Sequence, residues 1–163
     1  MSSFDKSTIV RFKNLGLRGY FRYLGPALPG PAGRAACDLW FTAPPRMTDL
    51  PVPDGGEPFA VDAQGHAVSG RVWGAGPTVY LVHGWGGHAG QMLALADQLS
   101  AQGLRPVIVE MPAHGRSSGS VSNLPQFARV LEYVAARLLQ QGYTLHAVVA
   151  HSLAANAGAY AAS

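Results

Sequence analysis

The sequence predicts an α/β fold in which helices flank a mostly parallel, twisted sheet. Three apolar runs of strand length, TVYLVHG, RPVIVEM and TLHAVVA, begin at Thr78, Arg105 and Thr144. Segments with the apolar spacing of a helix lie between these runs, at 89–102 and 124–141, and a glycine follows each segment. Apolar strands that alternate with helices in this way are typical of a parallel sheet with crossover helices.

Two shorter strands are expected before the first apolar run. They lie near 59–62 and 67–73, with a turn at Gln64 and Gly65 between them. A last helix, rich in small residues, is expected over 153–162, directly after the third apolar run. The sequence therefore accounts for about five strands.

The N-terminal 24 residues form a basic segment with apolar residues at near-helical spacing. They contain five basic residues and one acidic residue, whereas the rest of the chain is close to neutral. One interpretation is a helix on an anionic membrane surface; the other is a helix packed on its own domain with its basic face in solvent. We favour the second interpretation, because Gly16 and Gly19 weaken a helix.

Residues 25–58 contain eight prolines and many glycines. This composition predicts an extended surface connection and neither a helix nor an inner strand. We therefore expect residues 1–58 to form a basic helical segment with a proline- and glycine-rich connection, and residues 59–163 to form the α/β domain.

Composition and motifs argue against several classes of protein. No apolar run approaches the roughly 20 residues that span a bilayer, and the start MSSFDKST does not resemble a secretory signal. Cys37 is the only cysteine, so neither a disulfide nor a cysteine-based zinc site is expected, and a reducing cytoplasm fits best. Gly86 and Gly87 follow a strand but lack the spacing of a dinucleotide or phosphate loop. We predict no cofactor, no metal and no nucleic-acid partner.

Ser152 stands where chemistry is expected in a parallel sheet, at the carboxyl end of a strand. Its neighbours in AHSLA are small, which allows a cramped strand-to-helix turn that exposes the hydroxyl group. The helix that begins there offers unpaired backbone N–H groups, which can stabilise a developing oxyanion.

Two further stretches end strands in a similar way. HGWGG, from His83 to Gly87, follows the first apolar run, and EMPAHGRSSG, from Glu110 to Gly119, leaves the second. Glycine allows the backbone of such loops to approach a ligand closely.

The order and spacing of these three stretches over residues 59–163 resemble the α/β-hydrolase superfamily. The resemblance implies a partial α/β-hydrolase fold, with about five of eight strands. It also implies that Ser152 is the nucleophile and that the backbone N–H groups of Trp85 and Leu153 form the oxyanion hole. The residues expected to support the loops are His83, Gly84, Gly86, Gly87 and His114.

The chain departs from the usual motifs of the superfamily at four positions. Ala150 and Ala154 replace the two glycines around the nucleophile. Glu110 replaces the more frequent aspartate, and Ala113 replaces the glycine before His114. None of these changes forbids the fold.

The acid and the base of a catalytic triad are not assigned. A serine hydroxyl needs a base, and the base needs an orienting carboxylate, but no Asp, Glu or His follows Ser152 in the sequence. The six histidines are expected to be structural or solvent-facing. We therefore expect the N-terminal portion of a hydrolase of esters, thioesters or amides, with a small-molecule acyl substrate, that is inactive alone.

Alternative functions remain open on the sequence. The chain is alternatively a non-catalytic binding or interaction module, which completes its sheet by self-association through the open edge of the strand 144–150. An acyltransferase or a cofactor-free haloperoxidase shares the same serine turn. A serine at 152 argues against the branches with an aspartate nucleophile, namely haloalkane dehalogenases and epoxide hydrolases.

Overall fold

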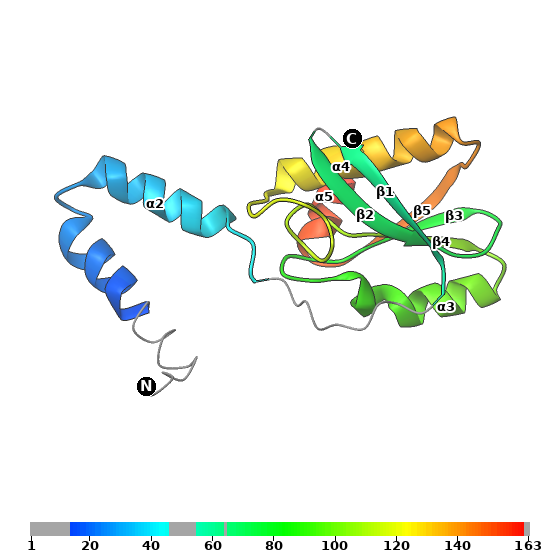
Figure 1. The fold of residues 1–163 in the computed structure, drawn as a ribbon, viewed down its shortest axis with the longest axis horizontal. Coiled ribbons are helices and arrows are strands. Elements are labelled where there is room, and N and C mark those ends of the chain that lie inside the picture. The colour runs from blue at the N-terminus through cyan, green and yellow to red at the C-terminus, as the bar shows by residue number, and fades with distance from the viewer. Residues whose placement is uncertain (1–13, 46–54, 64, 162–163) are drawn as a thin grey trace, which may run out of the picture. The chain divides into compact units, whose positions relative to one another are not determined.

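The computed structural model describes residues 14–45, 55–63 and 65–161 of the 163-residue chain. The chain divides into two compact units, residues 1–41 and residues 42–163. Figure 1 shows the helices and strands of both units, coloured from blue at the N-terminus to red at the C-terminus.

The second unit is built on a five-stranded sheet with the strand order β1-β2-β4-β3-β5. Strand β3 pairs in parallel with β4 and with β5, whereas β2 pairs antiparallel with β1 and β4. The strands are β1 (Glu57–Ala63), β2 (His66–Val72), β3 (Thr78–Val82), β4 (Arg105–Val109) and β5 (Leu145–Ala150). The predicted α/β class is confirmed, and the three apolar runs are the three parallel strands.

Alternate residues of the central strands enter two separate cores. Tyr80 and Val82 of β3 pack with α4 (Leu124–Gln140) and α5 (Leu153–Ala161), whereas Val79 and Leu81 pack with α3 (Leu93–Ala101). Figure 1 shows α4 and α5 on one face of the sheet and α3 on the other. Because successive side chains point to opposite faces and both faces are covered by helices, the central strands are apolar on both faces.

The helices begin and end at residues that suit those positions. The Asn123 side chain accepts a hydrogen bond from the Gln126 N–H at 2.9 Å at the start of α4. A short 3₁₀ turn, η2 (Ala89–Met92), precedes α3. Gly103 and Gly142 follow α3 and α4 with φ of 76° and 84°, a left-handed conformation that glycine adopts without strain.

The first unit is helical in its described part. Residues 14–19 form an α-helix that continues into the π-helical turn η1 (Tyr20–Leu24), and helix α2 (Pro29–Phe41) follows a short turn. The helix expected from the apolar spacing of residues 1–24 is therefore present from residue 14 onward. Residues 1–13 lie outside the described part.

The expectation of an extended connection over residues 25–58 is wrong for Pro29–Phe41, which form α2. Pro29 and Pro31 lie in the first turn, where backbone N–H groups have no intrahelical acceptor, so proline costs little there. The following RAACDL contains good helix formers. The position of the prolines decided the structure, and their number did not.

Candidate active site

Ser152 holds a left-handed backbone conformation between β5 and α5. Its φ is 55°, and Ala113 is the one other non-glycine residue with positive φ in the described part of the chain. This conformation costs an L-residue roughly 1–2 kcal/mol, and such strain concentrates at functional sites. The Ser152 side chain is exposed to solvent. The turn therefore leaves Ser152 exposed at the carboxyl end of β5.

Gly84 lies directly against this turn. A Cβ atom at position 84 would stand 3.0 Å from the Ser152 Cβ and 3.0 Å from the His151 Nδ1. Only a residue without a side chain lets the stretch that begins at His83 pack so closely on the serine. Ala154, where the superfamily has glycine, is fully buried and belongs to the core that α5 forms with α4.

The two expected oxyanion-hole donors come from these two adjoining segments. Leu153 is the first residue of α5, and backbone N–H groups in the first turn of a helix lack intrahelical acceptors. Trp85 follows Gly84, and its indole ring makes an edge-on contact with the His114 ring at 5.1 Å between centroids. It also stacks on Phe127 of α4 at 6.4 Å. The large side chain thus anchors the loop that carries the second donor.

His83 is a neutral, structural histidine. It is fully buried, and burial lowers its pKa from 6.5 to about 4. Its Nδ1–H donates to the Gly84 carbonyl oxygen at 2.8 Å, and its Nε2 accepts from the Met111 N–H at 3.2 Å. These bonds hold the loop after β3 to the loop after β4, and they leave neither ring nitrogen available for proton transfer.

His114 connects the same two loops from the other side. Its Nδ1–H donates to the Pro112 carbonyl oxygen at 2.8 Å, and its Nε2 accepts from the Gly86 N–H at 2.9 Å. The ring is buried beside the His83 ring, with 5.3 Å between centroids. His114 therefore positions the backbone next to Trp85 and does not serve as a free base.

Glu110 is a support residue to which the sequence pattern had assigned no role. Its buried carboxylate accepts hydrogen bonds from the Ala89 N–H at 3.3 Å and from the Arg116 N–H at 2.9 Å. Gly115 has no room for a Cβ atom, because that atom would collide with the carboxylate. The sequence signal for this role is a carboxylate at the end of a buried strand, five residues before a glycine, and the prediction of site residues did not use it.

The remaining histidines lie elsewhere or are adjacent to the serine. His88 caps η2, where its Nδ1 accepts from the Gly90 N–H at 3.1 Å. His146 is exposed near the start of β5, about 20 Å from Ser152 along an extended strand. His151 is exposed, and it precedes the nucleophile directly.

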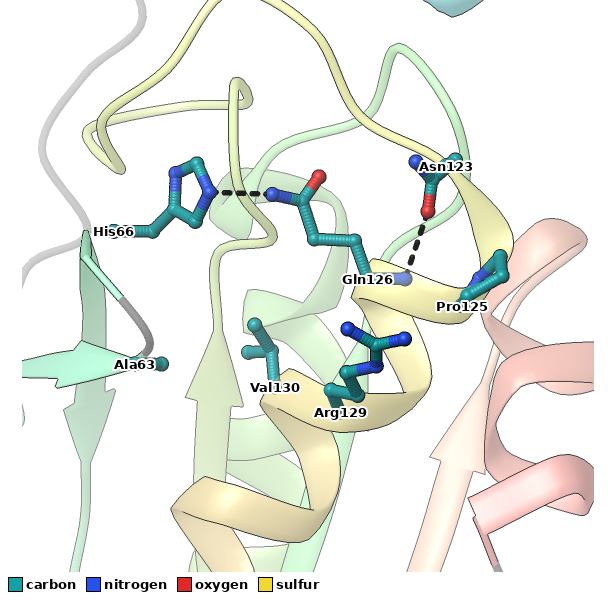
Figure 2. A pocket seen from close by; sticks show the side chains of 7 residues that line it. All are labelled: Ala63, His66, Asn123, Pro125, Gln126, Arg129 and Val130. Carbon is teal, nitrogen blue, oxygen red and sulfur yellow. Dashed lines mark hydrogen bonds between the residues drawn. The ribbon is translucent and has the colours of Figure 1, made fainter.

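His66 lines a hollow of about 310 Å³ beside the start of α4 (Figure 2). Its Nε2 lies 2.6 Å from the Gln126 Nε2. Ser152 lines neither this hollow nor two others of about 430 and 420 Å³. The hollow of about 420 Å³ is lined in part by Ala89 and Glu110, and so lies beside the support of the loops and not at Ser152 itself.

Within the described residues, Gly84, which precedes the expected donor Trp85, lies against the turn at Ser152. The histidines of the loops after β3 and β4, namely His83, His88 and His114, all bond to backbone groups. Within the same part of the chain, no group of three or more His, Cys, Asp or Glu side chains is arranged to hold a metal ion.

Comparisons with known proteins give the same fold. The family model described as serine aminopeptidase, S33, matches residues 74–162. Est1E from Butyrivibrio proteoclasticus, solved with ferulic acid bound, has a TM-score of 0.60 at 18% identity, over 64% of this chain and 46% of its own. An epoxide hydrolase from Vigna radiata has a TM-score of 0.56 at 20% identity, over 69% of this chain and 35% of its own.

A third similar structure is the thioesterase domain from the curacin biosynthetic pathway. Its TM-score is 0.53 at 24% identity, over 67% of this chain and 40% of its own. The chain thus spans less than half the length of these three structures. Their low identities support a shared fold alone. No curated protein sequence matches the chain.

Proposed function

The chain belongs to the serine aminopeptidase S33 family of α/β-hydrolases, and on that premise we propose that it carries the nucleophile and the oxyanion hole of a serine hydrolase. The observation that supports this proposal most directly is the positive φ of Ser152, 55°, at the turn between β5 and α5. Such strained conformations concentrate at functional sites, and a left-handed serine between a strand and a helix is the backbone shape of a nucleophile turn.

The proposed reaction begins with attack of the Ser152 Oγ on a carbonyl carbon. The O–H proton passes to a base, the C=O electron pair moves to oxygen, and the N–H groups of Trp85 and Leu153 stabilise the oxyanion. The electron pair then returns and re-forms the C=O bond, the bond to the leaving group breaks, and the leaving group takes the proton from the base. Water next attacks the ester formed on Ser152 by the same steps, which releases the acid and restores the serine hydroxyl group. The substrate class is an ester, a thioester or an amide of a small acyl group.

We propose that the base and the acid lie outside residues 1–163, so that these residues alone are inactive. Both nitrogens of His83 and of His114 have backbone partners, and no Asp, Glu or His follows Ser152 in the sequence. The same observation favours the second candidate function, a binding module that uses the fold without catalysis. The aspartate nucleophile of the epoxide-hydrolase branch is not proposed here, because the turn carries a serine.

The test is labelling of the protein from its own cells with a fluorophosphonate, followed by mass spectrometry of the intact protein and its peptides. We expect label on Ser152, its loss in Ser152→Ala, and its retention in Ser120→Ala, which removes an exposed hydroxyl group from the loop after β4. Both variants should unfold at the wild-type temperature. A folded protein that takes up no label at Ser152 contradicts the nucleophile and favours the binding module.

A further inference from the structure

The described part of the N-terminal unit, residues 14–41, buries almost none of its apolar side chains. Gly25 and Ala32 are its two buried residues. Six of its large apolar side chains are each about half exposed or more: Leu15, Tyr23, Leu24, Leu28, Leu39 and Trp40. Trp40 is the most exposed of them, at 79%. An apolar surface of this kind indicates a site that something else covers.

Four apolar residues at the start of α2 and within it share one face of the helix. Leu28, just before the helix, and Ala32, Ala35 and Leu39 follow one another at intervals of four, three and four residues, which places them in one stripe. Arg34 points to another side of the same helix by this spacing. Helix α2 therefore has an apolar stripe in which Leu28 and Leu39 are about half exposed and Ala32 is buried. Trp40 lies off this stripe, and Asp38 shares the charged flank with Arg34.

The positive charge of the protein is concentrated in this unit. Residues 1–41 contain six basic and two acidic residues, whereas residues 42–163 contain six basic and seven acidic residues. In the first helix, Arg18 and Arg22 alternate with aromatic residues, and the Arg22 guanidinium lies 5.8 Å from the centroid of the Tyr23 ring. Arg18 and Arg22 thus stand among exposed apolar groups, whereas Lys6, Arg11 and Lys13 lie outside the described residues.

This combination fits an anionic phospholipid surface. Leucine side chains enter the boundary between headgroups and acyl chains, tryptophan and tyrosine prefer that boundary, and arginines remain at the phosphate level. Among the described residues no helix is long and apolar enough to cross a membrane. We propose that residues 14–41 bind the surface of an anionic membrane and lie on it without crossing it.

The proposal does not depend on Ser152 or on any catalytic activity. Gly16 and Gly19 weaken the first helix, and the sequence therefore favours a helix packed on its own domain over a helix on a membrane surface. The structure adds a second helix, α2, which the sequence does not predict and whose Leu39 and Trp40 side chains are about half exposed or more. A protein partner, or the second unit itself, is the competing occupant of the same surface.

The experiment is co-sedimentation of the 163-residue protein with vesicles of phosphatidylcholine alone or with 30% phosphatidylglycerol (roughly the anionic content that attracts basic segments). We expect binding to the anionic vesicles, with loss of most of that binding in high salt. Arg22→Ala should lower the partition coefficient about fivefold, since one basic residue near such a surface contributes about 1 kcal/mol. Trp40→Ser should lower it about tenfold.

Matched variants in the second unit distinguish vesicle binding by residues 14–41 from nonspecific adsorption of the protein to vesicles. Leu139→Ser removes an exposed apolar residue of α4, and Arg129→Ala removes an exposed base of the same helix. Both variants should bind vesicles as the wild type does. Equal binding to both vesicle types, or unchanged binding of Trp40→Ser, would overturn the proposal. Loss of thermal stability in Trp40→Ser without any vesicle binding would instead indicate that the second unit covers the surface.

Discussion

Two residues of the second unit, Ala113 and Ser152, hold a backbone conformation that only glycine adopts without strain. Their φ values are 66° and 55°. Ala113 stands where the superfamily has glycine, and its N–H donates to the Ser118 carbonyl oxygen at 2.7 Å within a tight loop. The loop after β4 thus keeps its geometry although Ala113 is strained in it. Ser152 carries the same strain at the position proposed to be reactive.

Ala113→Gly should stabilise the protein by about 1 kcal/mol, because it removes the contact between Cβ and the backbone that a positive φ imposes. Urea unfolding monitored by circular dichroism measures the change. Ala136→Gly, at an exposed position inside α4, is the matched control and should destabilise by about 1 kcal/mol. Equal losses in the two variants would show that Ala113 is not strained.

His83 should make the protein sensitive to mild acid. Its pKa is lowered to about 4, so between pH 6.5 and pH 4 the unfolded chain binds a proton that the folded protein does not. The free energy of unfolding should therefore fall by about 3 kcal/mol as pH decreases through this window, and this contribution should not change further below pH 4.

The measurement is a series of urea unfolding curves between pH 7 and pH 4. His83→Asn should lower stability at pH 7, because it removes a buried packed ring, and should flatten the slope with pH. His146→Asn changes an exposed imidazole and serves as the control. A slope that is the same in His83→Asn and in the wild type would rule out His83 as its source.

At the scale of the elements, α4 connects the sheet to the loops of the site. Its first turn follows the loop after β4, and Phe127 packs against both Trp85 and His114. Asn123 begins the helix, and Pro125 lies in its first turn. The start of this helix therefore holds the aromatic residues that anchor the loop carrying Trp85.

Asn123→Ala should destabilise the protein by about 1 kcal/mol, because the Gln126 N–H loses its acceptor. Asn123→Ser should restore most of the loss, since serine caps a helix nearly as well. Thermal unfolding of the three proteins tests this expectation. If alanine and serine behave alike, the cap contributes nothing to stability.

At the scale of the whole second unit, the sheet has an open apolar edge. β5 is the last strand of the sheet in the described part, and its Leu145, Val148 and Val149 side chains are each about 40% exposed. Edge strands of this kind invite pairing with another chain. The predicted self-association through this strand remains untested.

Val149→Lys should weaken self-association of the 163-residue protein, because a charge on an edge strand opposes pairing with another strand. Sedimentation velocity at several protein concentrations measures the change. Leu139→Lys places the same charge at an exposed apolar position of α4 and should leave association unchanged. If both variants associate as the wild type does, the β5 edge is not the contact.

The sequence by itself determined the α/β class, the positions of the strands and helices of the second unit, and the order of its three motifs. These features are local, because apolar periodicity and the glycines after helices act within a few residues of the chain. The comparisons and the sheet topology confirm this part. The proline content of residues 25–58 does not predict helix α2, because Pro29 and Pro31 lie in its first turn, where proline costs little.

Only the tertiary structure decided what the polar residues near the motifs do. The left-handed turns at Ala113 and Ser152, the backbone partners of His83 and His114, and the role of Glu110 all depend on loops that are distant in sequence. Burial and hydrogen bonding arise when β3, β4 and β5 bring those loops together at the carboxyl ends of the strands. A sequence pattern identifies which residues have the chemistry, but the fold decides which of their atoms are already bonded and which can react.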